Sequence, residues 1–184
     1  MRAFISVELP EEIKKKIFKA TAEMRAIDSG IKWVEEQNLH LTLKFLGWVE
    51  DNDLESLKSL AEEAVKGFGA FKIKLEGFGS FPGGKTPRVL WVGITEGAEH
   101  LIGIANSLEK FLSGFRSEER GFSAHLTIGR VKDKKGVDEV NNKLAQIKDL
   151  SFSETVVDDV KIMKSTLTRK GPVYEMYHRI VLGR

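Results

Sequence analysis

Two short segments of the sequence combine residue types that could do acid–base chemistry on an anionic substrate. Residues 40–43 read His-Leu-Thr-Leu and residues 125–128 read His-Leu-Thr-Ile, 85 positions further along the chain. The chain has four histidines, and two of them open this pattern. The chance that two of the four precede a threonine in this way by accident is on the order of 1%, so the repeated motif predicts a functional site.

The chemistry of these motifs follows from the geometry of a strand. Residues i and i+2 of a strand face the same side, so His40 shares a face with Thr42, and His125 with Thr127. If the two strands meet across a cleft, one neutral imidazole can take a proton from a nucleophile while the other, protonated, gives one to a leaving group. Threonine hydroxyls can donate to the non-bridging oxygens of a phosphate held between them. The residue types therefore favour an in-line displacement at phosphorus without a metal.

Hydrophobic periodicity predicts the elements that must position the motifs. Several expected strands are neighbours in the sequence, which favours an α+β fold over a doubly wound parallel sheet. Strands are expected over residues 2–8, 40–45, 71–75, 88–94, 124–131, 155–163 and 173–182, and helices over residues 13–27, 53–65, 101–111 and 137–147.

A shift of the sequence by 85 residues superposes these elements as well as the motifs. The strand 2–8 falls on 88–93, the helix near Asp51 falls near Gly136, and the strand 71–80 falls on 156–165. Few residues match outside the motifs, so the repeat is one of pattern. We therefore expect residues 1–184 to form one bilobal domain with two pseudo-symmetric lobes. Each lobe should be a mainly antiparallel sheet backed by helices, with a central cleft between the two.

The composition excludes several classes of protein. Lys and Arg number 29 against 27 Asp and Glu, a net charge of +2, so any site for a polyanion must be local. The absence of cysteine excludes disulfides, thiolate metal sites and a cysteine nucleophile. No apolar run approaches the roughly 18 residues of a membrane span, so we expect a cytoplasmic protein without membrane contact.

Three segments resemble a known family. Residues 38–47 (NLHLTLKFLG) and 122–130 (FSAHLTIGR), together with the opening RAFISVELPEEI, are similar to the RNA 2′,3′-cyclic phosphodiesterases, also called 2′-5′ RNA ligases, of the two-histidine phosphoesterase superfamily. The resemblance implies a bilobal α+β fold and hydrolysis of a 2′,3′-cyclic phosphate to a 2′-phosphomonoester. It also implies that His40 donates the proton to the leaving 3′ oxygen and that His125 activates water. Thr42 and Thr127 would then grip the phosphate.

Three residues near the motifs are candidates for substrate binding. Arg130 would face away from His125 on a regular strand, but a bulge at Gly129 could swing it back, and the family likeness favours a phosphate contact. The alternative is a solvent-facing end of the strand. Phe45 could stack on a nucleobase or pack into the core. Lys44 shares the His40 face of a regular strand and could attract the RNA backbone, or be simply solvated.

Other signals point elsewhere and are weaker. Residues 79–86 match the P-loop pattern, but Pro87 and a β-rich run follow where a P-loop requires a helix, so a hairpin loop is expected. A zinc site at His40 and His125 would have too few ligands. His100 and His178 are most simply structural, and the basic stretch 130–135 is more typical of a solvated turn than of an RNA patch, although it could steer RNA.

The sequence therefore predicts a metal-independent phosphodiesterase without a cofactor that acts on RNA with 2′,3′-cyclic phosphate ends. We expect 2′-5′ ligation as the reverse reaction. One alternative is a non-catalytic RNA-end-binding protein, which the presence of both complete motifs disfavours because binding needs positive charge more than titratable histidine. Another is a phosphodiesterase for a different cyclic nucleotide. The sequence shows no sign of a protein partner, and a monomer is expected.

Overall fold

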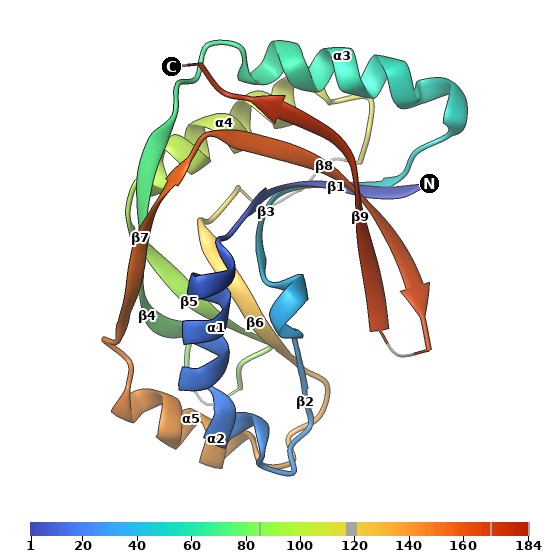
Figure 1. The fold of residues 1–184 in the computed structure, drawn as a ribbon. Helices are drawn as coiled ribbons and strands as arrows, with labels where there is room; N and C mark the ends of the chain where they lie inside the picture. The colour runs from blue at the N-terminus through green and yellow to red at the C-terminus, as the bar shows by residue number, and fades with distance from the viewer. Residues whose placement is uncertain (85, 117–120, 170, 184) are drawn as a thin grey trace.

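The fold is α+β, with two antiparallel sheets that stand against each other and helices around them (Figure 1). The computed structural model describes residues 1–84, 86–116, 121–169 and 171–183. Sheet A has the strand order β3 (His40–Trp48), β1 (Arg2–Glu8), β8 (Asp159–Thr168) and β9 (Gly171–Val181). Sheet B has the order β2 (Ile31–Trp33), β6 (His125–Val131), β5 (Val89–Glu96), β4 (Phe71–Phe81) and β7 (Ser151–Val157).

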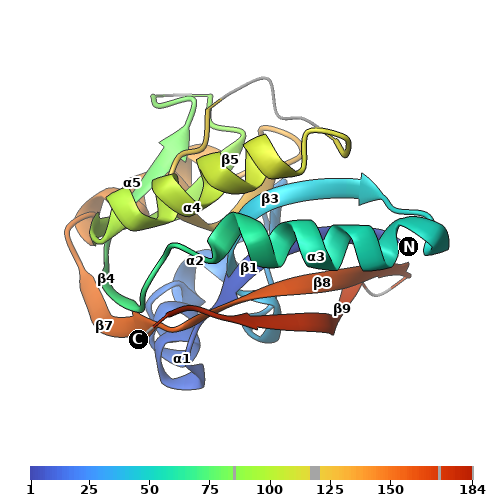
Figure 2. The same ribbon diagram turned by 90° about the horizontal axis from the view of Figure 1, so that it is seen from above.

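The helices lie along the outside of the sheets. Helices α3 (Leu54–Val65) and α4 (Ala98–Phe111) run side by side (Figure 2), and α2 (Ala22–Arg25) packs against α5 (Val137–Gln146). Two short 3-10 turns, η1 (Glu36–Asn38) and η2 (Asp51–Asp53), precede β3 and α3. Helix α1 spans Glu11–Ala20.

The two lobes are not the two halves of the sequence. In sheet A, β3 and β1 are followed by β8, and in sheet B their counterparts β6 and β5 are followed by β4. Strand β4 of the first repeat therefore lies in sheet B, beside β5 of the second repeat. Its counterpart β8 of the second repeat lies in sheet A, beside β1 of the first. The predicted fold class and the pseudo-symmetric lobes are confirmed, and the exchange of β4 and β8 ties the lobes together.

Two local predictions need correction, and one strand was missed. The expected strand 155–163 is two strands, because Val157 pairs with Phe71 in sheet B and Asp159 pairs with Val181 in sheet A. The apolar pattern runs on across that boundary, so periodicity could not reveal it. The expected helix 13–27 breaks at Thr21, whose hydroxyl donates to the carbonyl of Ile17, an alternative partner for the backbone that weakens helices. Strand β2 was not predicted.

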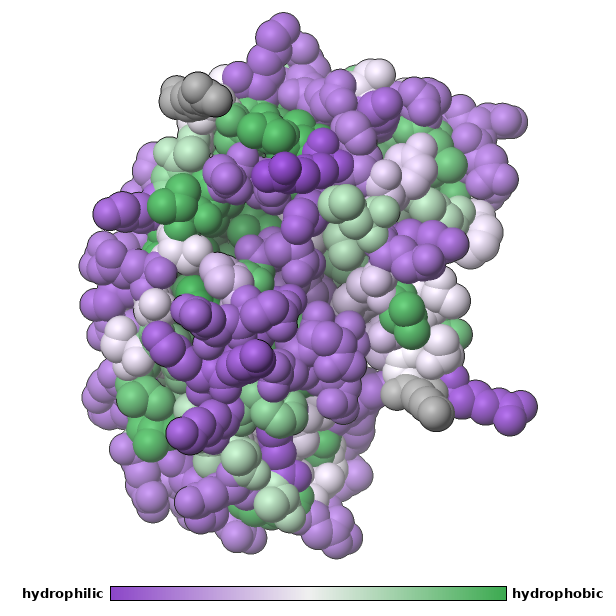
Figure 3. Space-filling view, in the orientation of Figure 1, coloured by the Kyte–Doolittle hydropathy of each residue, from purple (hydrophilic) through white to green (hydrophobic). Residues whose placement is uncertain are grey.

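A continuous hydrophobic core anchors the strands that carry the motifs. Leu41 on β3 and Leu126 and Ile128 on β6 are at most 1% exposed, because alternate residues of a half-buried strand point inward. Hydrophilic residues cover most of the face seen in Figure 3, where hydrophobic residues form small separate groups. Among the described residues, no helix is both long and apolar enough to span a membrane.

Candidate active site

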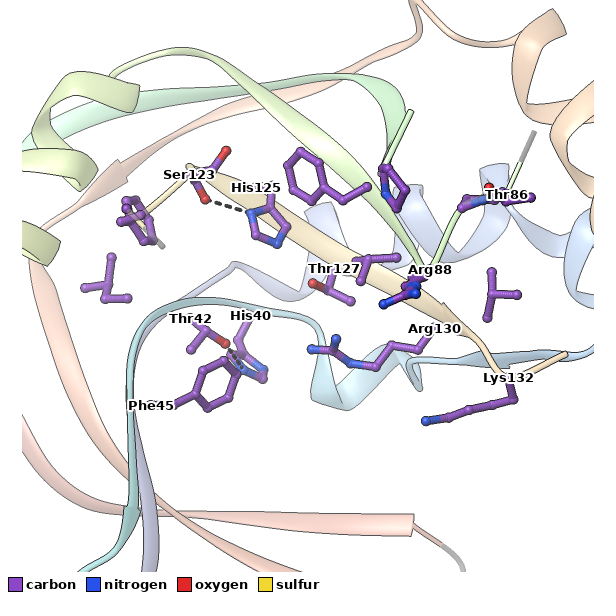
Figure 4. Close-up of a pocket in the computed structure, with 18 of the residues that line it drawn as sticks. His40, Thr42, Phe45, Thr86, Arg88, Ser123, His125, Thr127, Arg130 and Lys132 are labelled. Atoms are coloured by element: carbon purple, nitrogen blue, oxygen red, sulfur yellow. Dashed lines mark hydrogen bonds between the residues drawn. The ribbon is translucent and has the colours of Figure 1, made fainter. Parts of the chain in front are cut away.

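The two His–Thr pairs line one cleft. Strand β3 at the edge of sheet A contacts β6 of sheet B, and a cleft of about 1430 Å³ opens over them. His40, Thr42, His125 and Thr127 all line it, two from each sheet (Figure 4). The four side chains therefore converge across a cleft, as the pseudo-symmetry of the sequence predicts.

The two imidazoles are oriented in the same way. His40 donates from Nδ1 to the carbonyl of Asn38 at 2.7 Å, and His125 donates from Nδ1 to the carbonyl of Ser123, also at 2.7 Å. A carbonyl oxygen can only accept, so both Nδ1 atoms carry hydrogen and both Nε2 atoms are left for chemistry. The Nε2 atom of His40 lies 2.9 Å from the Thr42 hydroxyl.

A β-bulge interrupts each of the two strands at the same place. On β3, Thr42 pairs with Ser6 and Lys44 with Ile5, which leaves Leu43 as the extra residue. On β6, Thr127 pairs with Trp91 and Gly129 with Leu90, which leaves Ile128 as the extra residue. Because one extra residue reverses the alternation, the residue three positions after each threonine returns to the face of the histidine.

The bulge on β6 brings Arg130 back to the cleft. Arg130 lines the cleft, and its side chain extends from β6 toward His40 on β3 (Figure 4). Its charge also acts on the imidazoles of both His40 and His125. The bulge is present, and Arg130 is an exposed residue near the end of β6 that lines the cleft.

The bulge on β3 gives Phe45 and Lys44 different environments. Phe45 lines the cleft beside His40 and is 39% exposed, so it is not a core residue. The interpretation of Lys44 as a cation for the RNA backbone is wrong. Its side chain is 1% exposed, and its ammonium is held by Glu109 of α4 and by the carbonyl of Arg116 at 2.9 Å. Lys44 follows the extra residue Leu43, so its side chain points into the protein. It is therefore neither solvated nor free to meet RNA.

Burial lowers the pKa of both histidines. At His40 desolvation is the largest cause, and the positive charges of Lys14 and Arg130 add to it, whereas the hydrogen bond to Asn38 and the carboxylate of Glu8 raise the pKa. At His125 desolvation is again the largest cause, the hydrogen bond to Ser123 opposes it, and Arg130 adds to the lowering. A bound phosphate would oppose this lowering of the pKa, since an anion favours the charged imidazole.

Aromatic side chains fix the rings of both histidines. Phe4 stacks on His40 with ring centroids 4.8 Å apart, and Tyr174 of β9 meets His40 edge-on at 5.2 Å. Phe81 at the end of β4 meets His125 edge-on at 5.0 Å. Such contacts hold a ring in one orientation, as a proton-transfer group requires.

Comparison with known proteins identifies the family. A family model described as LigT like Phosphoesterase matches the chain twice, over residues 7–91 and 92–174. The chain belongs to the LigT-like phosphoesterases. The division between the two matches agrees with the 85-residue repeat of the sequence.

Relatives of this LigT-like phosphoesterase resemble it along the whole chain. A protein of Archaeoglobus fulgidus named RNA 2′,3′-cyclic phosphodiesterase is 40% identical over 177 residues, which are 95% of this chain and 97% of the relative. The crystal structure of TT0787 of Thermus thermophilus matches with a TM-score of 0.82 at 28% identity, covering 99% of this chain and 98% of that one. The crystal structure of E. coli LigT complexed with 3′-AMP matches with a TM-score of 0.79 at 25% identity, covering 100% of this chain and 98% of that one.

The cleft of this LigT-like phosphoesterase also contains residues that the sequence did not single out. Thr86, Arg88 and Lys132 line it near Arg130 (Figure 4), and Phe81 lines it beside His125. The basic stretch 130–135 was a partial signal for Lys132. The P-loop-like segment 79–86, interpreted as a hairpin loop that could lie beside the cleft, was a partial signal for Phe81 and Thr86. Nothing in the sequence places Arg88 there, because it reaches the cleft through the pairing of β4 with β5.

The weaker signals of the sequence are accounted for by the fold of this LigT-like phosphoesterase. Gly79 and Ser80 lie in β4 and β5 begins at Val89, so the P-loop-like segment connects two strands of a hairpin, with Lys85 outside the described residues. His100 stacks on Phe71, and His178 contacts a carboxylate oxygen of Glu62 at 2.7 Å, both away from the cleft. Within the described part of the chain, no three His, Asp or Glu side chains are grouped as metal ligands.

Proposed function

We propose that this protein hydrolyses 2′,3′-cyclic phosphate ends of RNA to 2′-phosphomonoesters, with His40 and His125 as a general acid–base pair. The observation that carries the proposal is the convergence of both His–Thr pairs on one cleft, with Arg130 acting on both imidazoles. The name of the Archaeoglobus fulgidus relative, RNA 2′,3′-cyclic phosphodiesterase, supports the substrate class.

His125 is the base in this mechanism. Its Nδ1–H is committed to the Ser123 carbonyl, so the lone pair of Nε2 can accept a proton from water. The water oxygen then attacks phosphorus on the side opposite the 3′ oxygen. The lowered pKa of His125 keeps the imidazole neutral near pH 7, as a base requires.

His40 is the acid, and the remaining groups hold the phosphate. As the bond between phosphorus and the 3′ oxygen breaks, Nε2–H of protonated His40 donates to that oxygen, and the product keeps its phosphate on the 2′ oxygen. Thr42, Thr127 and Arg130 donate hydrogen bonds to the non-bridging oxygens, where negative charge builds up. Proton exchange with solvent returns both histidines to their starting states.

The reverse reaction, 2′-5′ ligation, needs room for a second nucleoside. In hydrolysis the His125 side of the phosphate receives only a water molecule. The cleft on that side is nevertheless walled by Phe81, which is 36% exposed and meets the His125 ring edge-on. A nucleoside with a free 5′ hydroxyl fits the same geometry as water, with His125 taking the hydroxyl proton. This wall supports ligation as a second activity of the cleft.

Metal independence is part of the proposal. The proton transfers and the phosphate contacts above are all assigned to side chains of this chain. Hydrolysis of 2′,3′-cyclic AMP should therefore proceed unchanged in EDTA. Loss of the activity on chelation and its recovery with zinc would contradict this part of the proposal.

Single and double histidine variants test the function. H40A and H125A should each lower kcat by about 10²–10⁴-fold, which is the usual contribution of a general acid or base. Because both act in one displacement, the double variant should lose far less than the product of the two single losses. The product should be the 2′-phosphate. A wild-type protein that binds cyclic-phosphate RNA ends without turning them over would instead be the non-catalytic binding protein.

A further inference from the structure

The two histidines differ in the residue that faces each of them across the sheet. On β1, Glu8 pairs with His40, and on β5, Gly93 pairs with His125. Glu8 and Gly93 lie at equivalent positions of the 85-residue repeat. Residues paired across antiparallel strands share a face, so His40 has a carboxylate for a neighbour where His125 has a glycine.

The structure also explains why His125 has no side chain facing it from the neighbouring strand. A Cβ atom on Gly93 would lie 2.8 Å from the carbonyl oxygen of Glu76, closer than Cβ atoms approach backbone, so no side chain fits opposite His125. On the other strand the Glu8 carboxylate is held in place by Lys14 of α1, with 3.2 Å between Nζ and Oε2. The Lys14 side chain is 4% exposed and the Glu8 side chain 27%, so the ammonium is buried while the carboxylate keeps partial contact with water.

We propose that Glu8 is a positioning residue for the reaction, whose carboxylate opposes loss of the His40 proton and so favours His40 over His125 as the proton donor. This inference rests on the proposed function for the role of His40, but the electrostatic effect of Glu8 does not. The charged and titratable groups around His40 are Glu8 on β1, Lys14 on α1, Arg130 on β6 and Tyr174 on β9. Among them, Glu8 supplies the negative charge that favours the protonated imidazole.

A pH profile of two opposite charge changes tests the proposal. In the wild type, kcat/KM for 2′,3′-cyclic AMP should rise and then fall with pH, the descending limb reporting loss of the acid's proton from the free enzyme. E8Q should move the descending limb to lower pH, so the rate one unit above the wild-type midpoint falls by on the order of three- to tenfold. K14M removes a positive charge and should move the same limb to higher pH.

Two control variants separate charge from structure. E8D keeps the carboxylate and should restore the position of the descending limb. E11Q removes the charge of Glu11, the other carboxylate that pairs with Lys14, at 3.3 Å. Because the Glu11 side chain is 67% exposed, this change should leave the pH profile unchanged. If E8Q and K14M move the limb in the same direction, or if E8Q leaves both limbs in place, the proposal is wrong.

A titration that needs no activity provides the second readout. The ring protons of His40 and His125 can be followed by NMR in the free protein, with H40Q and H125Q identifying the signals. The midpoint of His40 should fall in E8Q and rise in K14M, while the midpoint of His125 stays in place. An unchanged His40 midpoint overturns the inference even in an active enzyme. An inactive wild type contradicts the proposed function, while the titration still decides the effect of Glu8.

Discussion

Arg130 on β6 lies at the position that Phe45 holds on β3, and both side chains reach the cleft because a bulge precedes each of them. The same backbone irregularity therefore serves two purposes. One strand presents a cation between the two histidines, and the other presents an exposed aromatic face. Under the proposed function, the cation suits a phosphate and the aromatic face a nucleobase, so the pseudo-symmetric halves of the cleft would divide the recognition of a nucleotide.

Replacement of Arg130 should weaken phosphate binding and shift the pH profile. R130A removes a charge-assisted hydrogen bond, so kcat/KM should fall by about 10- to 100-fold. The Arg130 charge lowers the pKa of both histidines, so both limbs should also move to higher pH. R130K keeps the charge and should keep the limbs near their wild-type positions, but an ammonium cannot bind a phosphate through two parallel hydrogen bonds as a guanidinium can. Limbs that stay in place in R130A would contradict the placement of this cation between the imidazoles.

Replacement of Phe45 should weaken the binding of the nucleobase and leave the rate of the chemical step nearly unchanged. F45A removes a stacking surface worth about 1–3 kcal/mol, so KM for a cyclic nucleotide should rise by about 5- to 100-fold with little change in kcat. W48A is the matched control, because Trp48 is on the same strand and 70% exposed but does not line the cleft. Equal effects of the two substitutions would show that Phe45 contributes only to the fold.

Phe45, Arg130 and Lys44 also show where sequence reasoning succeeds and where it stops. Gly129 marked a possible bulge on β6, because glycine in a strand is typical of such a site, and that bulge is what brings Arg130 to the cleft. The equivalent position on β3 is Lys44, and nothing local to it announces a bulge. Its burial depends on Glu109, a residue of a helix 65 positions away. The strict alternation of a regular strand therefore gave the wrong face for this lysine.

Non-local pairing accounts for the other differences. The histidine strands, their threonines and most helices follow from periodicity, which each segment carries in itself. The exchange of β4 and β8 between the sheets, and the pairing of Glu8 with one histidine and Gly93 with the other, depend on which strands meet. A repeat in the sequence could therefore predict two equivalent histidines, and only the sheet register distinguishes them.

The two cleft histidines should make the protein less stable in mild acid. Their pKa values are lowered from 6.5 in the folded state, so as the pH falls below about 6.5 the unfolded chain binds protons first. The free energy of unfolding should therefore decrease below that pH until the folded-state pKa values are reached. Urea unfolding at several pH values between 7.5 and 5.5 measures the slope. H40Q should flatten it, and a slope identical to that of the wild type would mean that His40 is not the group that titrates.

Replacement of the two threonines separates gripping the phosphate from moving protons. T42V and T127V remove one hydroxyl each while nearly preserving shape, and each should lower kcat/KM by about 10- to 100-fold because a hydrogen bond to a charged phosphate oxygen is lost. T42S and T127S retain the hydroxyl and should recover most of the rate. A hydroxyl does not titrate in this range, so both limbs of the pH profile should remain in all four variants. The closest test is T42V, since the Thr42 hydroxyl lies 2.9 Å from the Nε2 of His40. If T42V loses the descending limb, that hydroxyl is part of the proton path and does more than hold the phosphate.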